Sequence, residues 1–144
     1  MKYFVLALLL AVLGLLVTTF EPRPTPSYPL VRVRTDDGFF LTLVQSRVHD
    51  QARCREAVDA FVATLAKACP SCTVESEECT LELQGIDKAL AEGAPLPLYR
   101  VSAKELKIAL IGPPAKVRAR CERIAEGIVA QGMKTAACVY PEPG

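Results

Sequence analysis

Hydrophobic and polar residues alternate from residue 30 onward, and a period of two is typical of a β-strand with one buried face. Val31 and Val33 alternate with arginines, and Leu41 and Leu43 repeat the alternation after a turn signal, Asp-Asp-Gly, at residues 36–38. This pattern predicts a β-hairpin at the start of the folded domain.

The pattern changes to a helical period after residue 50. Asp50 is a suitable N-cap because its short carboxylate can accept a hydrogen bond from a free backbone N–H of the first turn. Apolar residues then recur at three- and four-residue spacings, at Cys54, Ala57, Val58, Phe61 and Leu65. A strand over residues 73–83 follows, so residues 30–83 are predicted to form a ββαβ unit.

The same order of elements recurs in residues 98–140. Two strands, over residues 99–103 and 106–111, precede a helix that begins near Pro114 and ends before Gly132. The matching pieces lie at offsets of 67 or 68 residues: Pro29–Val33 with Pro97–Val101, Leu41–Val44 with Ile108–Ile111, Ala52–Cys54 with Ala119–Cys121, and Val62–Ala63 with Val129–Ala130. Because the pieces keep one order and nearly one offset, we predict an internal repeat.

Two ββαβ halves of this size predict an α+β fold, with one sheet and two helices on one of its faces. Such a domain is a small two-layer sandwich, ferredoxin-like or related. Residues 85–93, between the halves, are predicted to form a short helical connector.

The N-terminal segment is strongly apolar. Residues 3–20 carry no charge, and a helix of this length would be about 27 Å long, close to the thickness of a hydrocarbon core. We therefore expect a single-pass membrane anchor at residues 1–20, a proline-rich linker at residues 21–29 and the domain at residues 30–144. The alternative is a cleaved signal peptide and a secreted domain.

The cysteines decide the expected orientation of the anchor. Arginines at positions 23, 32 and 34 follow the segment, and only Lys2 precedes it, so flanking charge weakly favours a cytoplasmic domain. All six cysteines follow the apolar segment, and an even number of cysteines behind such a segment indicates an oxidising compartment. We therefore place the domain in the periplasm or outside the cell.

Spacing along helix and strand predicts two disulfides. Cys54 lies about 20 Å from the end of its helix, and Cys79 lies about 23 Å along the returning strand, so the two reach similar heights. In the second half, Cys121 lies about 15 Å from the end of its helix and Cys138 about 10–13 Å along the following strand, so these two are also compatible in height. A bond between the two helices, Cys54–Cys121, is the main alternative.

The remaining cysteines, Cys69 and Cys72, form a C-x-x-C motif. In redox enzymes this motif opens a helix, whose positive end stabilises a thiolate. Here it follows a helix and opens a strand, which favours a structural pair or two free thiols over thiol–disulfide exchange. Zinc would require a fourth ligand, and His49 is the single histidine of the chain. We expect no metal, cofactor or catalytic residue.

Charged residues gather in two places. Cations near the starts of both helices form a candidate paired anion-binding patch: Arg53, Arg55, Lys116, Arg118 and Arg120. The alternative is a solvated helix face on which Glu56, Glu122 and Glu126 pair with these cations. Glutamates at positions 75, 77, 78 and 82 predict an exposed edge strand that resists pairing with other chains. The net charge of +1 gives no indication of nucleic-acid binding.

Three short pieces resemble sporulation-related (SPOR) repeats: Val44-Gln45, Tyr99-Arg100-Val101, and Gly112-Pro113 before a helix. The resemblance implies a small βαββαβ domain on a single-span anchor that binds peptidoglycan. The predicted hairpins and the cysteine content depart from that family's pattern.

These features favour a non-enzymatic, membrane-anchored envelope protein whose external domain binds a partner protein or forms part of an envelope assembly. A glycan- or peptidoglycan-binding module is the first alternative. A thiol–disulfide oxidoreductase that uses Cys69 and Cys72 is the second.

Overall fold

The computed structural model describes residues 23–143. Within this range, no helix has both the length and the hydropathy needed to cross a bilayer. The anchor predicted for residues 3–20 lies outside the described residues.

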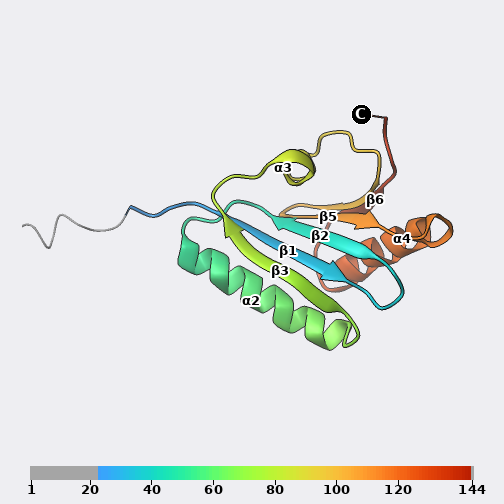
Figure 1. The fold of residues 1–144 in the computed structure, drawn as a ribbon, viewed down its shortest axis with the longest axis horizontal. Coiled ribbons are helices and arrows are strands. Elements are labelled where there is room, and N and C mark those ends of the chain that lie inside the picture. The colour runs from blue at the N-terminus through green and yellow to red at the C-terminus, as the bar shows by residue number, and fades with distance from the viewer. Residues whose placement is uncertain (1–22, 144) are drawn as a thin grey trace, which may run out of the picture.

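The centre of the fold is a six-stranded, fully antiparallel sheet (Figure 1). Its strands lie in the order β3-β1-β2-β5-β4-β6. Their bounds are β1 Tyr28–Arg34, β2 Phe40–Gln45, β3 Thr73–Thr80, β4 Tyr99–Ala103, β5 Leu106–Ile111 and β6 Ala136–Val139. The order is symmetric about the β2–β5 pair, because β3-β1-β2 come from the first half of the chain and β5-β4-β6 from the second.

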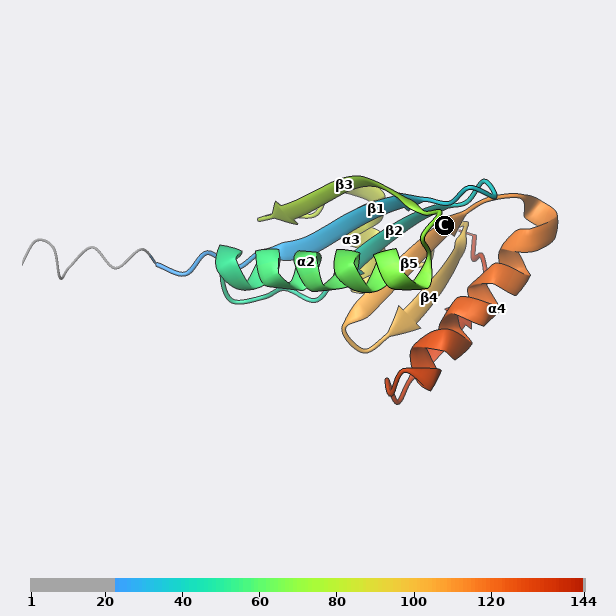
Figure 2. The ribbon, with the colours of Figure 1, turned by 90° about the horizontal axis from the view of Figure 1, so that it is seen from below.

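Two long helices pack on one face of this sheet (Figure 2). Helix α2, Gln51–Ala68, packs on β1 and β3, and helix α4, Pro114–Ala130, packs on β4 and β6 and touches β5. The Asp50 side chain accepts a hydrogen bond from the Arg53 N–H at 2.8 Å, as an N-cap does. The predicted apolar stripes face the sheet, where Val58, Val117 and Cys121 are buried.

A third helix covers the opposite face. Helix α3, Gly85–Glu92, packs its buried Leu90 against Leu30, Val44 and Ala109 of the sheet (Figure 1). The fold is therefore α+β with three layers at this point, and the expectation of a two-layer sandwich is corrected. Period-two alternation did not indicate the third layer because Leu30 and Val44 lie on the sheet face expected to be exposed.

The ferredoxin-like alternative is also corrected. That fold has the order βαββαβ, whereas the described elements run ββαβ, α3, ββαβ. A hairpin opens each half, so the sheet has six strands and its two central strands, β2 and β5, come from different halves.

Disulfides join helix to strand in both halves. Cys54 of α2 is bonded to Cys79 of β3, and Cys121 of α4 is bonded to Cys138 of β6, with S–S distances of 2.10 and 2.06 Å. These are the pairs that the spacing predicts, and the alternative Cys54–Cys121 pair does not form. Cys69 and Cys72 are bonded to each other.

Two predicted boundaries are corrected. β1 begins at Tyr28 and is preceded by a bridge between Ser27 and Val48, so the linker is shorter than residues 21–29. β3 ends at Thr80 instead of residue 83.

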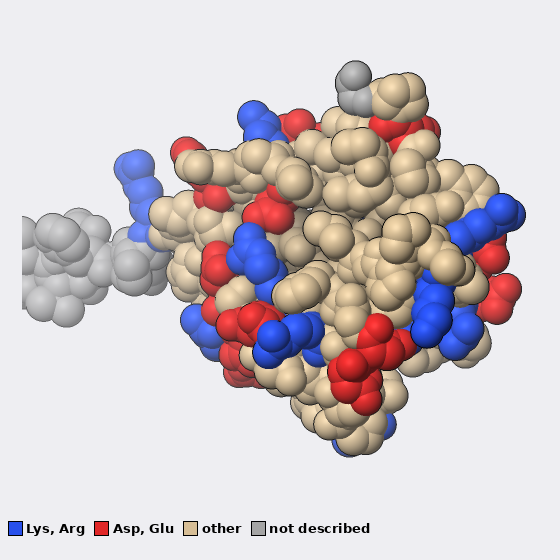
Figure 3. Space-filling model, turned by 45° about the vertical axis from the view of Figure 1, so that its right-hand side comes forward, with Lys and Arg blue, Asp and Glu red and all other residues tan. Residues whose placement is uncertain are grey.

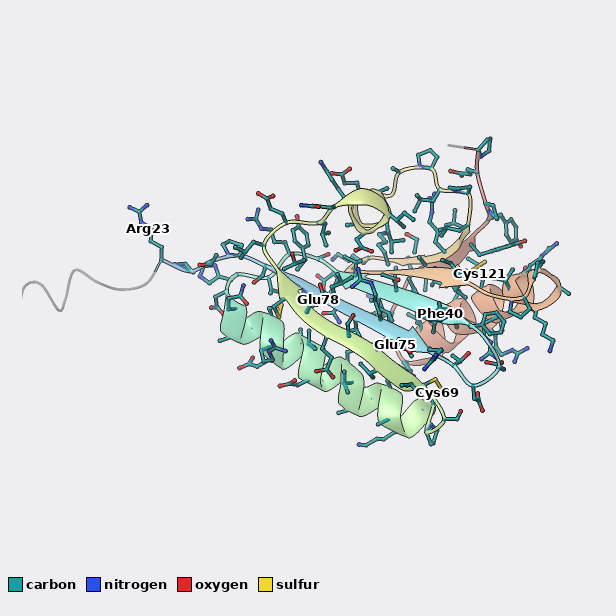
Figure 4. All side chains as sticks on the ribbon, in the orientation of Figure 1. Arg23, Phe40, Cys69, Glu75, Glu78 and Cys121 are labelled. Carbon is teal, nitrogen blue, oxygen red and sulfur yellow. A yellow bond between two sulfur atoms is a disulfide. The ribbon has the colours of Figure 1, made fainter. Side chains whose placement is uncertain are left out.

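β3 is an edge strand, as predicted from its glutamates, but the pairing between β3 and β1 contains a bulge. Glu75 pairs with Arg34 and Glu78 with Arg32, at 2.9 and 2.8 Å (Figure 4 labels both glutamates on β3). A strict period of two would place Glu75 and Glu78 on opposite faces of the strand, and the bulge explains why both reach arginines of β1.

Candidate functional site

An apolar groove lies between α2 and α4, above the two central strands of the sheet. Its volume is about 750 Å³. Its floor consists of side chains from β2 and β5, and its walls consist of side chains from the two helices. The principal apolar lining residues are Leu41, Leu43, Leu106 and Ile108 in the floor, and Phe61, Leu65, Ile124 and Ile128 in the walls. We call this surface the interhelix groove.

The groove exists because two helices cannot cover six strands. α2 packs over β1 and β3, and α4 packs mainly over β4 and β6. In the part of the chain that the structure describes, the backbones of α2 and α4 do not come within packing distance of each other. Figure 2 shows the two helices diverging, with β5 visible between them. The middle of this face is therefore covered by side chains alone.

The two ends of the interhelix groove differ chemically. One end is formed by Thr35, Ala68 and the Cys69–Cys72 disulfide, next to Arg120 and Arg123 of α4. The other end is formed by uncharged residues, Gln45, Leu106, Gln131 and Met133. Among the described residues that line the groove, the charged ones are Arg120 and Arg123, so the groove has one basic end.

The structure does not bring together the predicted paired anion-binding patch. β2 and β5 are antiparallel, with Gln45 opposite Leu106 and Phe40 opposite Ile111. α2 follows Gln45 and α4 follows Ile111, so the two helices start at opposite ends of the sheet. Arg53 and Arg55 therefore lie far from Lys116, Arg118 and Arg120. In the view of Figure 3, basic and acidic side chains are interspersed.

Two of the predicted anion-binding cations are engaged within the domain. The Arg120 guanidinium pairs with Asp37 of the β1–β2 turn and lies 4.6 Å from the centre of the Phe39 ring. Arg118 pairs with Glu122 at 3.1 Å and lies 5.0 Å from the centre of the Tyr140 ring. These contacts tie the start of α4 to the hairpin turn and to the residue after β6.

The Tyr140 hydroxyl donates a hydrogen bond to the Glu122 carboxylate at 2.7 Å. This bond, together with the hydrogen bond and the positive charge of Arg118, lowers the pKa of Glu122 below its ordinary value. A carboxylate with a lowered folded-state pKa stabilises the fold above its unfolded pKa, and this contribution is lost as the pH falls through the folded pKa.

We expect Tyr140→Phe to raise the pKa of Glu122 toward its ordinary value, because the largest cause of the shift is removed. The change should be visible in an NMR titration of the Glu122 carboxyl carbon. Arg118→Gln should also raise this pKa, because a hydrogen bond and a positive charge that favour the carboxylate are both removed. An unchanged Glu122 pKa in Tyr140→Phe would contradict the prediction.

The C-x-x-C motif lies at the basic end of the interhelix groove (Figure 4 labels Cys69). Cys69 is the C-cap of α2, and its N–H donates to the Leu65 carbonyl at 2.7 Å. A helix C-terminus carries a partial negative charge and disfavours a thiolate, so the position of Cys69 is unlike that of a redox motif at a helix start. Within residues 23–143, no cluster of three or more His, Cys, Asp or Glu side chains could hold a metal ion.

The interhelix groove was missed at the level of the sequence. Its wall residues Phe61 and Leu65 belong to the apolar stripe predicted for the first long helix, and Ile124 and Ile128 have the same helical spacing in the second, so all four resemble core positions in the sequence. The signal that could have revealed it was the number of strands, since six strands are wider than two helices can cover.

Comparison of this chain with protein-family models, with curated proteins and with solved structures gives no match.

Proposed function

We propose that this chain is a non-enzymatic, membrane-anchored envelope protein whose domain lies outside the cytoplasmic membrane and binds a partner protein in the interhelix groove. The observation that carries the binding function is the groove itself, an open apolar surface with a few polar groups at its ends. Protein surfaces of this kind are typical of binding sites.

Two features support the location. Residues 3–20 are long and apolar enough for one membrane span. The six cysteines of the described domain are paired in three disulfides, with no free thiol among residues 23–143. Disulfides of this kind form and persist mainly in oxidising compartments.

We also propose that residues 30–83 and 98–140 are an internal repeat. The common ββαβ order, the symmetric sheet and the helix-to-strand disulfide in each half support it. The interhelix groove would then lie on the approximate twofold axis of the repeat, with one floor strand and one wall from each half.

Protease accessibility and thiol labelling test the location. In spheroplasts, we expect added protease to digest the domain, and a polyethylene-glycol maleimide to label six cysteines only after denaturation and reduction. A protected domain, or six thiols that react without reduction, would show that the location is wrong.

Co-purification from mild detergent tests the binding function. We expect a partner protein to elute with the full chain and to be lost in Ile128→Asp, a change in the groove wall. Val129→Asp is the matched control, because Val129 is 44% exposed on the same helix and does not line the groove. Pelleting with peptidoglycan would favour the glycan-binding alternative, and reduction of insulin would favour the oxidoreductase.

A further inference from the structure

We infer that the interhelix groove holds a single helix of the partner protein, apolar along one side and acidic in its last turn, with its C-terminal end against Arg120 and Arg123. This inference rests on the proposed protein-binding function and specifies the kind of partner. Three observations carry it: the width of the groove, its lining and the position of its charges.

The width fits one helix. Neighbouring strands lie about 4.8 Å apart. α2 is centred between β3 and β1, and α4 close to β4 and β6, so about four strand spacings, or about 19 Å, separate the two helix axes. Packed helices lie about 8–10 Å apart. Near the middle of the groove, a helix between α2 and α4 would therefore be at packing distance from both, whereas a single acyl chain would leave much of this width empty.

The lining fits the apolar side of a helix. Large side chains of both walls, such as Phe61 and Ile128, are half-buried and therefore available for contact. Small residues between them permit close approach, since Ala57, Ala60 and Gly127 also line the groove. A Cβ atom built on Gly127 meets no atom within 4 Å, so the space beside it is open. Anchors at positions i, i+3, i+4 and i+7 of an amphipathic helix bind grooves of this form.

The charges set the direction of the bound helix. Arg120 and Arg123 lie at the groove end where α2 terminates, and no Asp or Glu belongs to the lining. Arg120 is held by Asp37, but Arg123 forms no ion pair with a described residue. A helix C-terminus is negative, and acidic side chains in its last turn add to that charge. The partner helix should therefore run parallel to α2 and antiparallel to α4.

The same charges argue against the chain's own apolar segment as the occupant. The described chain enters the sheet at Ser27, which bridges Val48 at the uncharged end of the groove. If residues 3–20 filled the groove as a helix, residue 20 would lie near that end. Lys2 and the N-terminal amine would then meet Arg120 and Arg123, which is electrostatically unfavourable.

Two synthetic peptides of identical composition test the inference. Both are 16-residue, N-acetylated, C-amidated helices with leucines at i, i+3, i+4 and i+7. The first peptide carries three glutamates in its last turn, and the second carries the same three glutamates in its first turn. We expect fluorescence anisotropy to show that the full chain, in nanodiscs, binds the first peptide about tenfold more tightly. Equal affinity for the two peptides would overturn the inference.

Variants locate the binding. We expect Arg123→Glu to abolish the preference between the peptides, and Arg118→Glu, on the same helix outside the groove lining, to keep it. Ile128→Asp should weaken both peptides at least tenfold, and Val129→Asp should weaken neither. Each variant must retain its three disulfides and its wild-type circular dichroism spectrum. An unchanged preference in Arg123→Glu would contradict the inference.

Cross-linking and displacement experiments distinguish a partner helix from other occupants of the interhelix groove, namely residues 3–20, a second copy of the chain and a lipid. A photoreactive residue at position 128 of the full chain alone should form no cross-link to residues 3–20 or to a second copy of the chain. Either cross-link overturns the inference. Displacement of the peptide by micromolar palmitate would indicate a lipid site instead. A partner that is lost in Ile128→Asp, together with equal affinity for the two peptides, overturns the helix inference but leaves partner binding in the groove. Equal co-purification with wild type and Ile128→Asp, or a cytoplasmic domain, overturns the proposed function itself.

Discussion

Replacing Phe39 with alanine is expected to lower the free energy of unfolding by about 3–5 kcal/mol, as for other fully buried phenylalanines. Phe39 is 1% exposed. Its ring packs in the core between the hairpin turn and α4, where Arg120 lies over it. Removing the ring leaves a cavity and also removes the surface on which the Arg120 guanidinium stacks.

Gly112 gives a second test of how tightly the Phe39 ring is packed. A Cβ atom on Gly112 would overlap the Phe39 ring, so Gly112→Ala should cost about 1–3 kcal/mol through overpacking. Gly127→Ala is the matched control, because its Cβ meets open space and alanine favours a helix, and it should stabilise by about 0.5–1 kcal/mol. Urea unfolding measures all three variants. A Gly112→Ala protein as stable as wild type would refute this account of the contact.

Replacing Cys54 and Cys79 together with alanine is expected to lower the free energy of unfolding by about 3 kcal/mol. The disulfide closes a segment with a sequence separation of 25, so its loss increases the entropy of the unfolded chain. Cys54 is also fully buried, and its truncation leaves a gap between α2 and the sheet. Removing Cys121 and Cys138, at a separation of 17, should cost a similar amount.

Replacement of Cys69 and Cys72 with alanine is the matched control for both helix-to-strand disulfides. This disulfide has a sequence separation of 3, and loop-closure entropy predicts a smaller cost of about 2 kcal/mol. Urea unfolding of the three double variants, each with its remaining disulfides oxidised, ranks the losses in the free energy of unfolding. If loss of Cys69–Cys72 costs as much as loss of Cys54–Cys79, loop closure is not the main source of stabilisation.

The disulfide pairs could be predicted because their geometry is local. The rise per residue of a helix and of a strand places Cys54 beside Cys79 and Cys121 beside Cys138 once each helix turns back into its strand. No knowledge of the other half is needed. The same local periodicity indicated both long helices and the two hairpins.

The pairing of charged residues could not be predicted in the same way. Arg120 pairs with Asp37, which is 83 residues away in the sequence, and this contact depends on where α4 crosses the sheet. The anion-binding prediction grouped cations by their positions within each helix. The structure does not bring the two groups together, because β2 and β5 are antiparallel and place the two helix starts at opposite ends.

The sequence alone determined the helices and strands, the ββαβ order of each half and the two helix-to-strand disulfides, because periodicity and rise per residue act over short distances. Tertiary structure decided how the halves join through β2 and β5, which face α3 covers and which charges meet. It also decided the interhelix groove, because the groove is the width of sheet that remains between two helices that pack on its outer strands.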